Sequence, residues 1–344
     1  MRIGILTAGG DCPGLNAVIR AVTRSALERG DEAVGIMRGY RGLAERDYMP
    51  LDMLTVSGLL PLGGTILRTS SYEPSTEASV HKVVEAFDAD ELDAVVAIGG
   101  EHTMEITSQL HEAEGLPLIG VPKTIDNDIV GTDFTFGFDT AVHVVSEAID
   151  RLHTTAQSHD RIMIVEVMGR NAGWIALYGG IAGGADGIVI PEVATTCEEI
   201  AAAMTRRHER GKDFSIVVVA EGANLAFEGG EVRQIRVSEE ADEYGYPRLG
   251  GIGGALAYEL ERLTGYETRT VVLGHVQRGG TPTAHDRVLA TRYGAKAYEL
   301  AKAGEFGRMV SLRGDEIGSV PLTEVHGIKT VDLALLDIAK RFFA

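Results

Sequence analysis

Short runs of Val, Ile and Leu alternate along the chain with longer segments of helical periodicity, and this alternation most constrains the fold. The apolar runs are Ile3–Leu6, Ala94–Ile98, Leu118–Val121, Ile162–Val165, Ile216–Ala220 and Thr270–Leu273. Apolar residues recur every three or four positions in Leu15–Leu27, Glu77–Phe87, Ala141–His153, Glu198–Arg207, Ile252–Leu263 and His285–Ala301. Continuous apolar runs are typical of strands buried on both faces by helices. The pattern predicts an α/β fold with mainly parallel sheets.

Length and charge limit the organisation and the partners. At roughly 150 residues per domain, the 344 residues predict two domains, with a boundary near residue 138. Lys and Arg number 32 against 50 acidic residues, and the net charge of −18 argues against binding to nucleic acid or an anionic membrane. There are only two cysteines and no apolar stretch of about 20 residues, so we expect a cytoplasmic protein without a membrane span.

Glycine pairs follow two of the apolar runs and lead into helical segments. Gly9 and Gly10 precede Asp11, and Gly99 and Gly100 precede Glu101. Paired glycines let backbone N–H groups approach a phosphate, and the helix N-terminus adds partial positive charge. A carboxylate beside such a site could hold Mg²⁺. Equally, the glycines could serve only tight connections, and Glu101 could be an ordinary acid at a helix start.

The segment Lys123–Asp128 follows a third run, at the strand end where α/β sheets bind ligands. It offers a carboxylate to take a hydroxyl proton, a second acid for a metal and a cation for phosphate charge. An Asx-rich turn would explain Asn127 and one Asp, but it gives no reason for Lys123 and Thr124 beside them. We favour a functional role for this segment.

Four arginines near the ends of apolar runs suggest a phosphate or sugar-phosphate site in an otherwise acidic protein: Arg161, Arg170, Arg269 and Arg278. For any single arginine, a salt bridge to one of the many acids is the simpler explanation. The sequence lacks the P-loop, the full G-x-G-x-x-G, H-E-x-x-H and G-x-S-x-G. Familiar hydrolase and dehydrogenase interpretations are therefore weakened.

In their order, these motifs resemble the bacterial-type 6-phosphofructokinase family, from Ile3 to about Leu322. The resemblance is carried by G-G-D-x-P-G-x-N at 9–16, P-K-T-I-D-N-D at 122–128, E-V-M-G-R at 166–170 and L-G-H-V-Q-R-G-G at 273–280. It implies two three-layer αβα domains with the active site in the cleft between them. Residues 1–137 plus about 277–325 would bind the phosphoryl donor, and 138–276 plus about 326–344 the sugar phosphate. It also implies a homotetramer or homodimer whose sites are completed across the subunit interface.

The resemblance assigns roles position by position. It implies catalytic roles for Asp126, Thr124 and Arg170, with Asp126 as the base that takes the proton from the 1-hydroxyl of fructose 6-phosphate. The implied sugar-phosphate contacts are Arg161, Met168, Gly169, Glu221, Arg269, His275 and Arg278, of which Arg161 and Arg269 serve the neighbouring subunit. The implied donor contacts are Gly10, Asp11, Arg68, Gly100, His102, Thr103 and Lys123. Glu101 and Asp128 are the implied Mg²⁺ ligands.

Position 102 departs from the family pattern, which usually has Gly in ATP users and Asp in pyrophosphate users. His102 would crowd the α-phosphate of ATP and, when protonated, could attract pyrophosphate, while Lys123 matches the pyrophosphate pattern. Arg68 stands where Gly is usual, and Ser71 stands where a donor-binding Arg is usual, so Arg68 is a candidate replacement.

These features lead us to expect Mg²⁺-dependent phosphoryl transfer to fructose 6-phosphate, giving fructose 1,6-bisphosphate. Pyrophosphate is the favoured donor and ATP the alternative. A non-catalytic sugar-phosphate-binding or regulatory paralogue is a further alternative.

Overall fold

The computed structural model describes residues 1–227, 232–241 and 247–343. The chain divides into two compact units: unit 1 comprises Met1–Thr140 and Arg278–Gly327, and unit 2 comprises Ala141–Gln277 and Ile328–Ala344. The sequence placed the first boundary after residue 137, and the division falls three residues later, inside the helix α5 (Phe138–His159). Within the described residues, no helix is both long enough and apolar enough to span a bilayer.

Unit 1 is built on one mainly parallel sheet. Its strands are β1 (Arg2–Thr7), β2 (Glu32–Ile36), β3 (Tyr48–Leu51), β4 (Ala94–Gly99), β5 (Leu118–Thr124), β6 (Phe136–Gly137), β16 (Arg308–Arg313) and β17 (Glu316–Pro321). The order is β17-β16-β5-β4-β1-β2-β3, with β6 paired to β5. Only the edge strands β3 and β17 run antiparallel to their neighbours.

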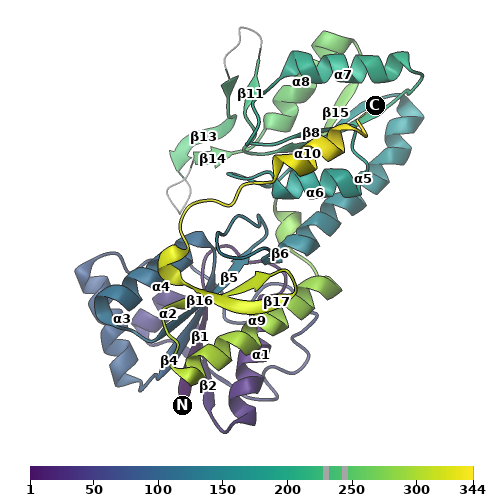
Figure 1. Cartoon of the computed structure of the whole chain (residues 1–344). Coiled ribbons are helices and arrows are strands. Elements are labelled where there is room, and N and C mark those ends of the chain that lie inside the picture. The colour runs from purple at the N-terminus through teal and green to yellow at the C-terminus, as the bar shows by residue number, and fades with distance from the viewer. Residues whose placement is uncertain (228–231, 242–246, 344) are drawn as a thin grey trace. The chain divides into compact units, whose positions relative to one another are not determined.

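Helices cover both faces of this sheet (Figure 1). They are α1 (Leu15–Glu28), α2 (Tyr40–Glu45), α3 (Glu77–Ala89), α4 (Glu101–Glu114) and α9 (Ala284–Ala303), with the short η2 (Leu322–Glu324) after β17. Side chains of α2, α3 and α4 share a buried cluster with one face of the strands, including Leu6, Val95 and Leu118. On the other face α1 and α9 lie side by side, so closely that Gly294 faces the backbone of Val18.

Unit 2 has a smaller parallel sheet in the order β15-β7-β10-β8. Its strands are β7 (Ile162–Val167), β8 (Gly187–Val189), β10 (Ser215–Ala220) and β15 (Thr268–Val272). Unit 2 also has two short sheets. The first contains β9 (Thr195–Thr196), β11 (Leu225–Ala226) and β12 (Val232–Arg233). The second pairs β13 (Arg236–Ala241) with β14 (Pro247–Leu249).

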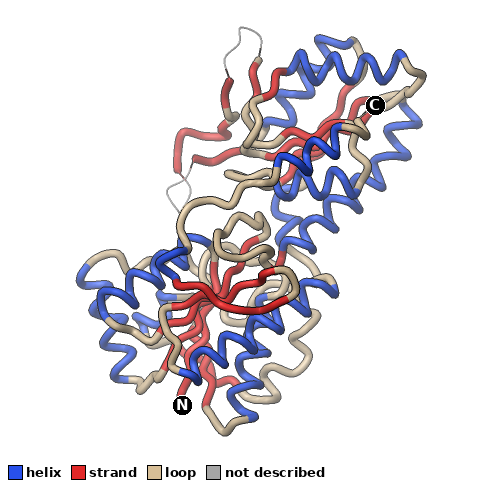
Figure 2. The backbone as a smooth tube through the Cα atoms, viewed as in Figure 1, coloured by secondary structure: helices blue, strands red, loops and turns tan. Residues whose placement is uncertain are grey.

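The helices of unit 2 are most of α5, α6 (Trp174–Ala182), α7 (Cys197–Glu209), α8 (Ile252–Thr264) and α10 (Leu333–Lys340), with η1 (Gly274–Arg278) at its boundary. Apolar side chains of α7 and α8 pack on one face of the strands, around Ile164 and Val217. Figure 2 shows these helices in blue on one side of the red strands, with α5 and α6 on the other. Each unit is thus a helix–sheet–helix layer structure, which confirms the predicted α/β class with mainly parallel sheets.

Candidate active site

The three motifs of unit 1 meet at one edge of its sheet. Strands β1, β4 and β5 are parallel neighbours, with Thr7 opposite Ile98 and Gly99 opposite Pro122. Parallel strands in register end together, so the two glycine loops and the segment after β5 occupy the same carboxyl edge. The first loop leads into α1 and the second into α4, whose N-termini start at Gly14 and Gly100.

The first glycine loop closes over a buried cation. Lys123 is only 4% exposed, and its ammonium group donates a hydrogen bond to the carbonyl of Gly10. The guanidinium of Arg278 lies on the same loop: a Cβ on Gly10 would be 2.8 Å from its Nη1. Burial lowers the pKa of Lys123 and nearby Arg278 lowers it further, while Asp11 and Asp126 oppose this. Two cations therefore flank the loop in unit 1.

Burial alternates along the segment that follows β5. Ile125, Asn127 and Ile129 are buried, whereas Asp126 and Asp128 are partly exposed. Asn127 adopts a left-handed backbone conformation (φ 51°), and its Oδ1 accepts a hydrogen bond from the amide of Thr135.

The backbone of this segment is also fixed at its start. The amide of Asp126 donates to Oγ1 of Thr124 at 3.0 Å. Asn127 thus stabilises the turn with its side chain, as the Asx-turn interpretation of the sequence expected. The two carboxylates project from a fixed backbone on the partly exposed side.

Two carboxylates of unit 1 lie close enough to influence each other. Burial raises the pKa of Glu101, and the charges of Asp128 and then Glu105 raise it further. A divalent cation would relieve this repulsion, and Mg²⁺ is commonly held by one or two carboxylates together with substrate phosphates. In the described ranges no group of three or more His, Cys, Asp or Glu could form an all-protein metal site. Glu101 and Asp128 therefore fit a Mg²⁺ ion shared with a phosphate ligand.

His102 follows Glu101 in the first turn of α4 and contacts two carboxylates. Its Nε2 lies 2.7 Å from Glu73, and its Nδ1 lies 3.3 Å from Glu105. Partial burial alone would lower the pKa of His102, but Glu73 and Glu105 outweigh it, so the pKa is raised. The sequence interpretation treated a protonated His102 as a cation available to pyrophosphate. In the structure its charge is balanced by two acids, which changes that interpretation.

Arg68 has a backbone conformation that favours glycine. Its φ is 58°, and its carbonyl accepts a hydrogen bond from Oγ1 of Thr7 at 2.7 Å. Glycine adopts this conformation without steric cost, which fits the Gly that the family usually has here. An arginine at this position carries backbone strain. The side chain is exposed, and Thr103, also predicted as a donor contact, is instead buried beneath Gly99.

In unit 2 a second set of predicted residues gathers at the carboxyl ends of the strands. Met168, Gly169 and Arg170 follow β7, and Glu221 follows the neighbouring β10. Gly169 has a φ of 130°, and a Cβ on Gly222 would lie 1.9 Å from the carbonyl oxygen of Arg170. The two loops therefore require glycine to approach each other. His275 lies just after β15 and is exposed.

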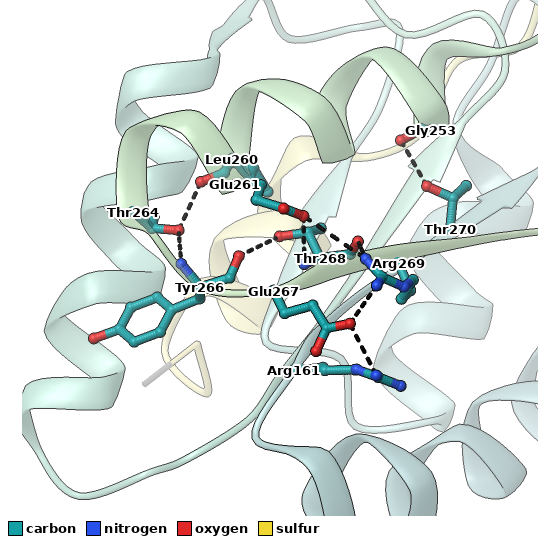
Figure 3. Close-up of polar contacts among 10 residues, drawn as sticks. All are labelled: Arg161, Gly253, Leu260, Glu261, Thr264, Tyr266, Glu267, Thr268, Arg269 and Thr270. Carbon is teal, nitrogen blue, oxygen red and sulfur yellow. Dashed lines mark hydrogen bonds and ion pairs between the residues drawn. The ribbon is translucent and has the colours of Figure 1, made fainter.

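Arg161 and Arg269, drawn in Figure 3, lie at the opposite end of the same sheet. Arg161 precedes the first residue of β7, and Arg269 is the second residue of β15. At about 3.3 Å per residue, the six residues of β7 separate Arg161 from the loop that holds Arg170 by roughly 20 Å. One chain therefore does not bring all the predicted sugar-phosphate contacts of unit 2 together.

Sequence reasoning missed two acids that contact predicted site residues. Glu73 reaches His102 from a segment without helix or strand, and nothing in the sequence signalled this contact. Glu267 contacts both Arg161 and Arg269. Here a signal was present, because residues two apart in an extended chain share a face, as Glu267 and Arg269 do.

Comparisons with known proteins agree with this arrangement. The phosphofructokinase family model matches residues 2–301. A protein of Streptomyces coelicolor named pyrophosphate–fructose 6-phosphate 1-phosphotransferase is 50% identical, with 100% of both chains covered. A second protein of that organism, named ATP-dependent 6-phosphofructokinase 2, is 51% identical, again with 100% of both chains covered.

Solved structures give the same result. Phosphofructokinase from Saccharomyces cerevisiae matches with a TM-score of 0.80 and 32% identity, covering 94% of this chain and 45% of the yeast chain. The present chain thus spans less than half of that yeast chain. A pyrophosphate-dependent phosphofructokinase from Marinobacter aquaeolei, at 24% identity and a TM-score of 0.82, covers 97% of this chain and 86% of its own and supports the fold. Fold, site and relatives together define an α/β phosphotransferase. The chain belongs to the phosphofructokinase family.

Proposed function

We propose that the protein is a 6-phosphofructokinase that transfers a phosphoryl group to the 1-hydroxyl of fructose 6-phosphate, giving fructose 1,6-bisphosphate. One observation carries this proposal: two glycine loops, the buried Lys123 and the partly exposed Asp126 and Asp128 meet at one carboxyl edge. Such an edge can hold phosphates, neutralise their charge and present a base. Phosphoryl transfer needs little more than this positioning and charge neutralisation.

In this proposal each side chain has a limited task. Asp126 accepts the proton of the attacking hydroxyl, and its backbone is held by Thr124. Gly10, Asp11 and Gly100 belong to the loops that receive the donor phosphates, with Lys123 beneath the first loop. Arg170 neutralises charge on the group being transferred.

Glu101 and Asp128 would hold the Mg²⁺ ion, and burial followed by the charge of Asp128 raises the pKa of Glu101. When bound, the ion neutralises phosphate charge and orients the donor. The protein's part is to supply two oxygen ligands on rigid elements, at the first turn of α4 and on the segment after β5.

The sugar phosphate is proposed to bind at the carboxyl end of the unit 2 sheet, through Met168, Gly169, Glu221 and His275. Arg161 lies about 20 Å away, just before β7, and Arg269 lies near the same end of the neighbouring strand β15. This separation supports their service to a neighbouring subunit's site, as a closed homodimer or homotetramer allows. Arg278, which lies against Gly10, would reach the phosphates from the donor side.

We propose pyrophosphate as the donor. Support comes from the first turn of α4, where His102 is held by Glu73 at 2.7 Å and Glu105 at 3.3 Å. A bulky, anchored side chain at this position leaves less room for the larger donor, a triphosphate with a nucleoside. ATP is the second candidate, because relatives with 51–52% identity are named ATP-dependent.

A donor comparison tests the proposal. Purified protein, fructose 6-phosphate and Mg²⁺ are combined with pyrophosphate, ATP or polyphosphate in turn, and fructose 1,6-bisphosphate is measured. Turnover with pyrophosphate alone supports the proposed donor, turnover with ATP alone supports the second candidate, and no product with any donor contradicts the proposed function. His102→Gly should improve ATP use if the anchored imidazole is the obstruction; an unchanged kcat/KM for ATP would place the obstruction elsewhere.

A further inference from the structure

Arg161 and Arg269 meet at a single oxygen of Glu267 (Figure 3). Nη2 of Arg161 lies 2.8 Å from Oε1 of Glu267, and Nη2 of Arg269 donates to the same Oε1. Strand pairing brings them together, because β7 and β15 are parallel neighbours with Ile162 opposite Thr268. The amide of Ile162 also donates to the carbonyl of Glu267 at 3.0 Å. The backbone of Glu267 is thus held against β7, and its carboxylate is held by the two guanidinium groups.

Without a carboxylate between them, two guanidinium groups on adjacent strands would repel each other. Glu267 Oε1 shares its negative charge between the two guanidinium groups, and a second acid, Glu261, lies farther off, with its Oε2 3.8 Å from Nη1 of Arg269. Each guanidinium has five N–H donors, and Oε1 occupies only part of them. The side chains of Arg161 and Arg269 are 26% and 51% exposed, so part of their N–H donors remains open to an anion.

We propose that Glu267 is a positioning residue that holds Arg161 and Arg269 as a preorganised pair for the phosphate group of the acceptor sugar. This inference rests on the proposed function, in which both arginines bind that phosphate in a neighbouring subunit's site. Glu267 acts only through the arginines. Without it, two long side chains would have to be ordered when the sugar phosphate binds, and this entropy loss weakens affinity.

An opposite effect has to be weighed, because the Glu267 carboxylate also repels an incoming phosphate. The side chain of Glu267 is 40% exposed and that of Arg269 is 51% exposed. Solvent and salt screen charges at such a site. Loss of order in two arginines therefore outweighs the relief of repulsion, and removal of the carboxylate should weaken binding.

Glu267→Gln in the full-length enzyme tests this. We expect the KM for fructose 6-phosphate to rise roughly 5- to 30-fold, from the cost of ordering two side chains, with kcat within about twofold. Glu147→Gln is the matched control, because it breaks an exposed glutamate–arginine pair, Glu147 with Arg151 at 2.7 Å on α5. The control should leave KM unchanged. An unchanged or lower KM in Glu267→Gln would overturn the proposal.

The same substitution in an Arg161→Ala/Arg269→Ala background separates positioning from a general structural role. In that background Glu267→Gln should have no further effect on KM, since nothing is left to position. An equal rise in both backgrounds would overturn the proposal. If the double arginine variant itself keeps a normal KM, the assignment of the arginines to the sugar phosphate fails. If that variant raises KM and Glu267→Gln does not, only the role of Glu267 fails.

Discussion

Lys123 is a buried cation that contacts the first glycine loop, and we propose that it also serves the reaction. Its ammonium group donates to the carbonyl of Gly10 and is largely removed from solvent. Lys123→Met keeps most of the buried volume and removes the charge. Because a preorganised charge beside developing phosphate charge is commonly worth 10²–10³ in rate, we expect kcat with pyrophosphate to fall roughly 100-fold. Thermal unfolding should change little, and a kcat within about threefold of wild type would contradict the role.

Asp286 is a second buried ionisable residue, in the first turn of α9. Its Oδ2 accepts hydrogen bonds from the amide and Oγ1 of Thr140, and its Oδ1 has no partner among the residues that the structure describes. Burial raises the pKa of Asp286 from 3.8 to about 6. The protonated carboxyl is therefore favoured in the folded chain. Its contribution to stability is fully present below about pH 4 and is lost as the pH rises through about 6.

Asp286→Asn isolates this contribution, because the amide does not titrate. The free energy of unfolding of wild type minus that of the variant should fall by up to about 3 kcal/mol between pH 4 and pH 7. Urea denaturation at several pH values measures this difference. A difference that stays constant over this range would show that Asp286 does not titrate between the folded and unfolded states.

At the scale of helices and strands, much of the fold followed from hydrophobic periodicity. The runs Ile3–Leu6, Ala94–Ile98 and Leu118–Val121 lie within β1, β4 and β5, and Leu15–Leu27 lies within α1. The glycine pair at 99–100 predicted the start of α4, but periodicity did not give its extent, because polar residues interrupt the apolar stripe; α6, which contains two glycines, was not predicted. Periodicity also did not reveal the hairpin of β16 and β17, because the residues of β17 are exposed or only partly buried.

The candidate site divides in the same way. Gly10, Glu101 and Asp126 were predictable as neighbours, because parallel strands in register end at one edge. The Glu73 contact depends on the tertiary path of an irregular segment, which no periodicity encodes. The left-handed φ of Arg68 is not signalled by the arginine itself, and only the resemblance, which places Gly at this position, pointed to it.

The pairing of α1 with α9 depends on one glycine. A Cβ on Gly294 would lie 2.7 Å from the carbonyl oxygen of Val18 and 2.7 Å from Cβ of Ala21. Gly294→Ala gains helix propensity, but backbone atoms of α1 must move to admit the methyl group. We expect a net destabilisation of about 1–3 kcal/mol, measured by urea unfolding.

A glycine with open space provides the control for this substitution. Gly254 lies in the first turn of α8, and nothing lies within 4 Å of a Cβ built there. Gly254→Ala should stabilise by roughly 0.5–1 kcal/mol through helix propensity alone. If Gly294→Ala were equally stabilising, the close approach of α1 and α9 would not limit side-chain size.

At the scale of the whole molecule, the two ends of the unit 2 sheet predict complementation between defective chains. In the proposed arrangement, Asp126→Ala removes the base from a chain's own site, whereas Arg161→Ala impairs the site of its neighbour. In mixed oligomers, a site formed by the intact Asp126 of one chain and the intact Arg161 of the other recovers. Random pairing should restore roughly a quarter of wild-type activity at low fructose 6-phosphate.

The two variants are expressed together or refolded as a mixture, and the activity is compared with that of each variant alone. A mixture of Asp126→Ala with Asp128→Ala serves as control, because both substitutions damage the same chain's site and recover nothing if no carboxylate crosses the interface. Activity equal to the average of the separate variants would contradict a site shared between subunits.

Unit 1 is formed from two separate chain segments, Met1–Thr140 and Arg278–Gly327, and this affects how its sheet can form during translation. Strand β5 ends at Thr124, but its outer neighbour β16 begins only at Arg308, after unit 2's main sheet has been translated. At 5–20 residues per second, the ribosome needs roughly 10–40 s to supply that strand. Until then one border of the nascent sheet exposes unsatisfied backbone groups. The sheet of unit 1 is thus completed only by a strand that emerges after the main sheet of unit 2.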